Sequence, residues 1–125
     1  FDVGFESVGI IAALGPGPHP EGIFVGAHVA SMTYGGFSEF GVLSTRHLIP
    51  VGRASPAVVA MLLSGLTASI GLQEAGRMTT GEVVMITAAA GGTGMFAVQL
   101  AKLAGNHVIG TCGSDEKADM LRRLG

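Results

Sequence analysis

The pattern of apolar and polar residues divides the chain into a strand-rich first part and a second part that contains helices. In the first part, short runs of β-branched, aromatic and small residues alternate with turn-forming glycines and prolines. Such spacing is typical of short strands joined by turns. We predict strands over residues 3–14, 27–32 and 36–44, with a proline- and glycine-rich loop at 15–22. Together they predict part of a small antiparallel barrel.

A long apolar helix is predicted to begin at Ser55 and Pro56. Serine is a good N-cap and proline a good first helical residue, and the run that follows is helical in pattern as far as Gly76. The residues that recur at steps of three and four are Ala60, Leu63, Thr67, Ile70 and Glu74. Because the run is apolar nearly all round, we expect the helix to be buried on most sides.

The remainder of the chain alternates between strands and helices. Residues 82–90 form a β-branched run without polar alternation, as in a strand covered on both faces. After a glycine-rich bend, a helical run ends at Gly105, a second short strand covers 107–112, and Ser114 is the N-cap of a last helix. Strand, helix, strand and helix in this order predict a parallel sheet. The predicted fold class is therefore α/β.

Composition narrows the classes of protein that fit this pattern. The chain has 125 residues, enough for one domain of ordinary size, and a net charge of -2 without a basic cluster. We therefore expect no nucleic-acid partner, because nucleic-acid phosphates need clustered lysine and arginine. Phe1 and Gly125 both fall where an element is in progress, so we expect a fragment of a longer protein. The single Cys112 cannot form an internal disulfide, which fits a reducing compartment such as the cytoplasm.

Two runs without charge, 54–73 and 83–101, are about as long as a bilayer span and raise the alternative of a membrane hairpin. Gly91, Gly92 and Gly94 lie in the middle of the second run, where each costs roughly 1 kcal/mol of helix stability relative to alanine. The β-branched residues of that run lie before the glycines, and the helix formers lie after them. A strand–turn–helix needs this division and a membrane helix does not, so no membrane span is expected.

The segment TAAAGGTG, residues 87–94, is a candidate binding site. The turn between a parallel strand and its helix presents helix N–H groups, which can hold an anion when no Cβ atoms stand in the way. Against the dinucleotide fingerprint G-x-G-x-x-G, the segment has Ala89, Gly91 and Gly94, so alanine replaces the first glycine. Gly91 would allow a pyrophosphate to approach, Gly94 would allow the helix to pack on the strand, and Thr93 adds a hydroxyl. The alternative is a buried glycine-rich turn without a ligand.

The end of the second strand indicates which dinucleotide would bind. An acid at this place binds the ribose hydroxyls of NAD, but the strand ends without one. Asp115 lies near the usual spacing, yet it falls inside the helix start and is better interpreted as a first-turn acid. Gly113, Ser114 and Lys117 offer a small residue, a hydroxyl and a cation, which suits a 2′-phosphate. We therefore predict NADPH as cofactor; the alternative for Lys117 is a solvated helix lysine.

These motifs together resemble the medium-chain dehydrogenase/reductase superfamily, in its quinone oxidoreductase-like branch. The resemblance rests on SGLTA at 64–68, AAAGGTG at 88–94 and GTCGSDEK at 110–117, and it covers nearly the whole chain apart from the proline-rich loop. It implies a GroES-like catalytic domain followed by a Rossmann domain, with NADPH in the cleft between them. The domains implied for this chain are a partial GroES-like β-barrel domain at 1–54, a connecting helix at 55–76 and the first half of a Rossmann dinucleotide-binding domain at 77–125.

The resemblance also implies the chemistry. Zinc-using relatives carry Gly-His-Glu with the histidine as a ligand, whereas this chain has Gly4-Phe5-Glu6, so no metal is expected. Without a Lewis acid, hydride addition to an activated C=C bond is easier than alcohol oxidation, because the carbonyl of an enone takes up the developing charge. Tyr34 is a candidate catalytic hydrogen-bond donor; the alternatives are that it is a surface aromatic residue and that the donor lies in a part of the complete protein outside this chain, as the resemblance implies. Thr67 resembles a family threonine near the nicotinamide, with a packing role in the apolar helix as the alternative. The residues expected to bind the cofactor are Thr67, Ala90, Gly91, Gly92, Thr93, Gly94, Gly113, Ser114 and Lys117.

We expect the complete protein to reduce an enone or a 15-oxoprostaglandin-like substrate with NADPH, and residues 1–125 alone to have little activity. Reduction of a quinone by NADPH is the alternative reaction, and a non-catalytic nucleotide-binding module is the alternative from another class. The resemblance implies that the complete protein is a homodimer. It also implies that the molecule it binds as substrate is a small enone or quinone. It also implies the peroxisome as a second expected location, in addition to the cytoplasm.

Overall fold

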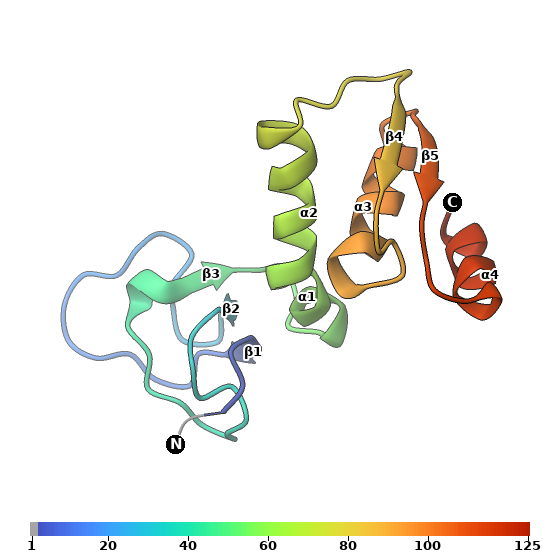
Figure 1. The fold of residues 1–125 in the computed structure, drawn as a ribbon. Helices are drawn as coiled ribbons and strands as arrows, with labels where there is room; N and C mark the ends of the chain where they lie inside the picture. Colours follow the sequence, from blue (N-terminus) through green and yellow to red (C-terminus); the bar gives the residue numbers. More distant parts are fainter. Residues whose placement is uncertain (1–2) are drawn as a thin grey trace. The chain divides into compact units, whose positions relative to one another are not determined.

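The computed structural model describes residues 3–125, and the chain forms two compact units, Phe1–Leu63 and Ser64–Gly125 (Figure 1). The first unit holds strands β1 (Ser7–Ile10), β2 (His28–Ser31) and β3 (Leu48–Pro50), with the short 3₁₀ helix η1 (Thr45–His47) before β3. A helix of four segments follows, α1 (Pro56–Ala60), η2 (Met61–Gly65), α2 (Leu66–Ile70) and η3 (Gly71–Ala75). The second unit continues with β4 (Val83–Ile86), α3 (Gly92–Leu103), β5 (His107–Gly110) and α4 (Asp115–Leu124).

The three strands of the first unit form an antiparallel sheet with β2 in the middle. Val8 pairs with Ala30, and Ala30 pairs in turn with Ile49, so the register is continuous across the sheet. The core of this unit consists of Ile11, Ile23, Ala27 and Val29, with Leu14 and Leu48 packed against it. The first two predicted strands are therefore present and antiparallel, in shorter form than the sequence pattern suggests.

The strand predicted over residues 36–44 is wrong. That stretch forms a turn and bends and then irregular backbone, and the third strand forms later, as β3. The amide of Gly36 donates to the carbonyl oxygen of Gly4 at 2.9 Å, and a Cβ atom on Gly36 would lie 2.8 Å from the carbonyl oxygen of Glu6. Contact with a distant segment therefore determines the backbone at Gly36, and no strand pairing continues from it.

The long helix begins where the sequence predicts. The hydroxyl of Ser55 accepts a hydrogen bond from the amide of Val58 at 3.4 Å, and Pro56 is the first helical residue. Two of its segments, η2 and η3, are wound as π-helix. Within η2, the amide of Leu63 donates to the carboxylate of Glu6 at 2.8 Å. A π-turn interrupts the α-helical hydrogen-bond pattern, and here a side chain from near β1 binds one of its backbone groups.

The expected burial of this helix is wrong for the described residues. Only Leu62 and Ala68 are buried, whereas Leu63 and Ile70 are 48% and 56% exposed. Residues 3–125 leave most of the helix uncovered, although its sequence is apolar nearly all round. By length and composition alone, Pro56–Ala75 is also apolar enough to cross a membrane, which is weak evidence because core helices of soluble proteins pass the same test.

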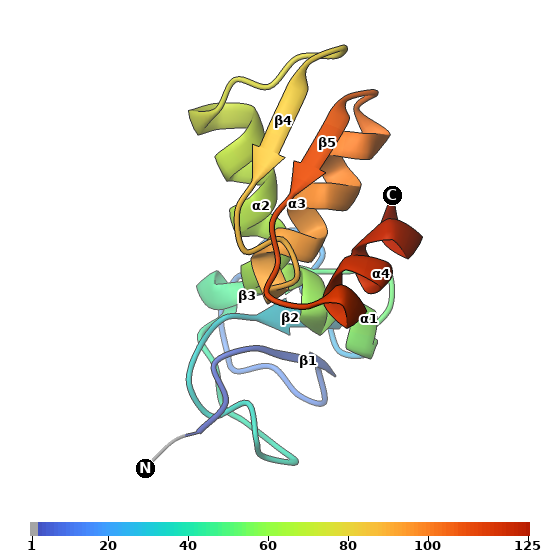
Figure 2. The same ribbon diagram turned by 45° about the vertical axis from the view of Figure 1, so that its right-hand side comes forward.

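In the second unit, β4 and β5 lie side by side and parallel, with Val84 opposite Val108 (Figure 2). The predicted order of strand, helix, strand and helix is confirmed. Gly105 follows α3 with φ +82°, a conformation that glycine adopts without steric cost. The hydroxyl of Ser114 accepts a hydrogen bond from the amide of Lys117 at 3.3 Å and so caps α4, as predicted.

One face of this sheet carries the core of the second unit. The buried side chains of the core are Ala68, Ile86, Ala89, Ala97, Val98, Ala101 and Leu121. On β4, Val84 and Ile86 pack with this core, whereas Val83 and Met85 are 67% and 64% exposed. The prediction that residues 82–90 are covered on both faces is therefore wrong for the described residues, because their helices cover only one face of the strand.

Candidate functional site

The segment between β4 and α3 forms a tight turn against which the helix starts. The amide of Gly91 donates to the carbonyl oxygen of Ala88 at 2.9 Å and closes the turn. Ala88 has φ +50°, in the left-handed region that residues with a Cβ atom rarely adopt. A Cβ atom at Gly94 would lie 2.6 Å from the carbonyl oxygen of Ala88 and 2.7 Å from that of Ala89. Only glycine at this position lets α3 begin so close to the turn.

The first amides of α3 are free to bind a ligand. Among the hydrogen bonds of residues 3–125, none is donated by the backbone N–H groups of Gly92, Thr93 or Gly94. Gly91, Gly92 and Thr93 are exposed, and the bend has no Cβ atom at 91, 92 or 94. Unpaired N–H groups and the helix dipole together attract an anion to a helix N-terminus. The bend therefore has the exposed amides and open surface that a phosphate group requires.

Two hydroxyl residues that were not predicted as site residues border this bend. The Oγ of Ser64, in η2, lies 3.1 Å from the position that a Cβ atom would occupy if one were added to Gly92. Thr111 directly follows β5, and its Oγ1 accepts a hydrogen bond from the amide of Ala88 at 3.2 Å. Ser64 opens the SGLTA motif and Thr111 lies in GTCGSDEK, so the motifs contain both residues. The contacts themselves depend on folding and leave no signal in the local sequence.

The candidate residues for the 2′-phosphate lie at the same edge of the sheet as the bend. β4 and β5 are parallel, so the segments that follow them meet at one edge. Gly113, Ser114 and Lys117 are all exposed there. The hydroxyl of Ser114 accepts from the amide of Lys117, so its own hydrogen is available to another acceptor. Lys117 forms no ion pair with any residue of 3–125. Asp115 and Glu116 lie in the same helical turn, and their negative charges would repel an anion. Lys117 is therefore the residue of this turn whose charge would attract the 2′-phosphate.

Thr67 and Tyr34 lie in different units. Thr67 is exposed on α2, and the neighbouring Ala68 packs in the same core cluster as Ala89 of the bend. Tyr34 belongs to the first unit and is 70% exposed, with its ring edge-on to that of Phe5 at a centroid distance of 5.4 Å. The roles proposed for these two residues stay predictions.

In the Gly4-Phe5-Glu6 segment, the side chains of Phe5 and Glu6 both contact other residues of the first unit. Phe5 packs against Tyr34, and the carboxylate of Glu6 accepts from the amide of Leu63. Within residues 3–125, histidine, cysteine, aspartate and glutamate side chains nowhere gather in a group of three or more that could hold a metal ion. The expectation of a zinc-independent reaction stays a prediction.

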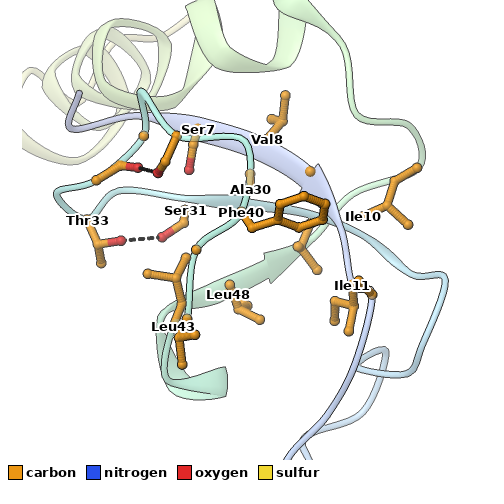
Figure 3. Close-up of a pocket in the computed structure, with 18 of the residues that line it drawn as sticks. Ser7, Val8, Ile10, Ile11, Ala30, Ser31, Thr33, Phe40, Leu43 and Leu48 are labelled. Atoms are coloured by element: carbon orange, nitrogen blue, oxygen red, sulfur yellow. Dashed lines mark hydrogen bonds between the residues drawn. The ribbon is translucent and has the colours of Figure 1, made fainter. Parts of the chain in front are cut away.

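The first unit also contains an open cavity of about 740 Å³ beside β1 and β2 (Figure 3). Its lining is mixed: the apolar side chains include Val8, Ile10, Ile11, Phe40, Leu43 and Leu48, and polar residues such as Glu39 lie among them. The hydroxyls of Ser31 and Thr33, 2.9 Å apart, form a hydrogen bond at its edge. Tyr34 belongs to the same lining. The candidate hydrogen-bond donor thus lines a cavity that apolar side chains share.

The order of the elements defines a class of protein. An antiparallel unit precedes a parallel β–α–β–α run, and a glycine bend opens the first helix of that run. A glycine bend at this place is the phosphate-binding feature of the Rossmann fold. The combination is that expected for the end of a GroES-like domain followed by the first half of a Rossmann domain.

Comparison with known proteins gives the same class. No protein-family profile matches the chain. Over 125 residues it is 48% identical to prostaglandin reductase-3 of Mus musculus and 50% identical to that of Bos taurus, covering all of this chain and 33% of each relative. It is 45% identical over 126 residues to a probable quinone oxidoreductase of Leishmania amazonensis, covering all of this chain and 36% of that relative. The chain spans about a third of the length of these relatives.

Solved structures that are similar to the chain belong to the same class of protein. A mycobacterial protein in complex with NADPH matches with a TM-score of 0.85 and 32% identity, over 100% of this chain and 40% of that one. A 2-haloacrylate reductase matches with a TM-score of 0.84 and 32% identity, over 98% and 39%. A Pseudomonas syringae quinone oxidoreductase matches with 0.82 and 33%, over 96% and 38%. The resemblance to the quinone oxidoreductase-like branch of the medium-chain dehydrogenase/reductase superfamily is confirmed along the whole chain, and so is the α/β fold class.

Proposed function

We propose that the complete protein carrying this chain is an NADPH-dependent oxidoreductase. The observation that carries the proposal is the set of N–H groups at Gly92, Thr93 and Gly94, which have no acceptor among the described residues, at a bend where Gly92 and Thr93 are exposed. Such groups at the start of a helix in a β–α–β unit suit the pyrophosphate of a dinucleotide. The similar mycobacterial structure in complex with NADPH supports the same cofactor.

In this proposal the chain's own residues hold two parts of the cofactor. The free amides of Gly92, Thr93 and Gly94 bind the pyrophosphate, Ala90 and Gly91 form the turn in front of them, and the hydroxyl of Thr93 adds a donor. Ser114 and Lys117 bind the 2′-phosphate, with Gly113 leaving room for the ribose. Because no acid ends β5 and Lys117 has no ion-pair partner among residues 3–125, the phosphorylated cofactor is favoured over NADH.

We further propose that the substrate is an activated alkene such as an enone or a 15-oxoprostaglandin, reduced without zinc. When bound, NADPH supplies the hydride. The protein must orient the alkene and donate a hydrogen bond to the oxygen on which charge develops. Tyr34, which lines the cavity of the first unit, is one candidate donor, with a donor outside this chain as the alternative, and Thr67 is proposed to lie near the nicotinamide. The names of similar proteins, prostaglandin reductase-3 and 2-haloacrylate reductase, support reduction of a conjugated C=C bond.

The remaining features of the complete protein follow from the same resemblance. We propose the domain division at 1–54, 55–76 and 77–125, a homodimer, and a location in the cytoplasm or peroxisome. A small molecule is the expected partner, without nucleic acid and without a membrane span.

A quinone is the second candidate substrate, because proteins named quinone oxidoreductases from Leishmania amazonensis and Pseudomonas syringae are similar to the chain. The test mixes the complete protein with NADPH and either an enone or a quinone, and follows loss of NADPH absorbance. Consumption with the enone alone supports alkene reduction, and consumption with the quinone alone supports the alternative. NADPH binding without either reaction would indicate a nucleotide-binding module, and absence of binding would refute the proposal as a whole.

A further inference from the structure

Thr111 contacts the turn before α3 through two hydrogen bonds. Its carbonyl oxygen accepts from the amide of Ala89 at 2.8 Å, and its Oγ1 accepts from the amide of Ala88 at 3.2 Å. The amide of Thr111 also donates to the carbonyl oxygen of Ile86 at 3.0 Å. The backbone bonds continue the parallel pairing of β4 and β5, and any residue with a backbone N–H can make them. The bond to Ala88 requires a hydroxyl at position 111.

Ala88 is the residue of this turn whose conformation most needs support. Its φ of +50° is disfavoured for a residue with a Cβ atom. Its carbonyl oxygen accepts from Gly91 and would lie 2.6 Å from a Cβ atom at Gly94, so its orientation determines where α3 begins. Ala88 is exposed, and no surrounding core holds it in place. Among residues 3–125, the hydroxyl of Thr111 is the group that binds its amide.

We propose that Thr111 is a positioning residue for dinucleotide binding. Its hydroxyl holds Ala88 in the left-handed conformation and thereby orients the free amides of Gly92, Thr93 and Gly94. The inference rests on the proposed function, because the amides matter only when a pyrophosphate binds them. Thr111 acts through the turn and contacts neither substrate nor the reacting atoms.

The test compares Thr111→Val with Thr111→Ser in the complete protein. Valine removes the hydroxyl and nearly preserves the shape of the side chain, whereas serine keeps the hydroxyl. Loss of one neutral hydrogen bond is expected to weaken NADPH binding by about threefold to tenfold in Thr111→Val. Thr111→Ser should stay within about twofold of the original protein. Adenosine 2′-monophosphate, which has no pyrophosphate, should bind equally to all three proteins.

Unchanged NADPH affinity in Thr111→Val would overturn the inference, and so would an equal loss for NADPH and adenosine 2′-monophosphate. The second result would mean general damage to the fold. Hydrogen exchange measured by mass spectrometry on the ligand-free protein gives a separate readout. The amide of Ala88 should exchange faster in Thr111→Val and as slowly as in the original protein in Thr111→Ser. Failure of the original protein to bind NADPH would refute the proposed function, and the exchange result would then decide the role of Thr111 in the turn.

Discussion

Replacing Gly94 by alanine would push helix α3 away from the turn that precedes it. The new Cβ atom would lie 2.6 Å from the carbonyl oxygen of Ala88 and 2.7 Å from that of Ala89. A favourable carbon–oxygen contact is about 3.3–3.6 Å, so the backbone must separate by roughly 0.7 Å. Both neighbours are main-chain atoms, which cannot rotate away as a side chain can. Overpacking of this kind costs about 1–3 kcal/mol of stability.

The same displacement would move the free amides at the start of α3. A hydrogen bond to a charged group contributes about 1.5–3 kcal/mol, and about 1.4 kcal/mol corresponds to a factor of ten in affinity. Loss of one such bond therefore predicts at least a tenfold weaker affinity for NADPH. Urea unfolding followed by circular dichroism measures the first effect, and fluorescence titration with NADPH measures the second, both on the complete protein.

Two other glycines provide matched controls. A Cβ atom at Gly71, in the helical segment η3, would meet nothing within 4 Å, and one at Gly91 would meet only the carbonyl oxygen of Ala88, at 3.2 Å. Gly71→Ala should raise the unfolding free energy by roughly 0.5–1 kcal/mol and leave NADPH affinity unchanged. Gly91→Ala should fall between Gly71→Ala and Gly94→Ala. Original stability and affinity in Gly94→Ala would refute the reasoning, since the contact distances would then not limit the backbone.

Three further changes test other parts of the site. Lys117→Ala should weaken NADPH binding tenfold or more and leave NADH binding unchanged, because it removes a contact of roughly 1.5–3 kcal/mol to the 2′-phosphate; an unchanged ratio of the two affinities would exclude that role. Tyr34→Phe should lower kcat for the enone by about 10²–10³-fold with little change in NADPH affinity, and an unchanged kcat would show that the donor lies elsewhere. Gly110→Ala would place a methyl group 3.1 Å from the Cβ atom of Ala89 and should lower the unfolding free energy by about 1–3 kcal/mol. Adding Ala89→Gly should restore part of that loss in urea unfolding, whereas purely additive losses would contradict a direct contact.

The features that the sequence predicts well are those that depend on neighbouring backbone. Ser55 and Ser114 cap their helices through bonds to amides three residues away, and Gly105 adopts its positive φ one residue beyond Ala104, the C-cap of α3. The glycine bend is likewise recognisable, because Gly91 and Gly94 act on residues of the same turn. Local spacing carries each of these signals.

The features that the sequence does not predict depend on distant segments. Gly36 lies where a strand is expected, but its backbone is determined by contacts with Gly4 and Glu6. Val83 and Met85 belong to a continuous apolar run, yet their exposure depends on which segments pack on the sheet. No periodicity within a strand can indicate whether its second face is covered. The contact of Thr111 with Ala88 likewise depends on the register between β4 and β5, which brings position 111 beside the turn.

The alanine at the first position of the dinucleotide fingerprint has a structural explanation of the same kind. Ala89 is completely buried, and its methyl group occupies space beside β5, where Gly110 has no Cβ atom. The two positions therefore share room for one methyl group, and this chain places it on the turn and not on the strand. For Gly94 there is no facing residue whose side chain could be shortened to make room for a methyl group, because its close neighbours are the carbonyl groups of the turn itself. The first position of the fingerprint thus depends on the facing strand, whereas the last depends on the turn alone, which is why alanine at 89 and glycine at 94 are compatible with one phosphate-binding bend.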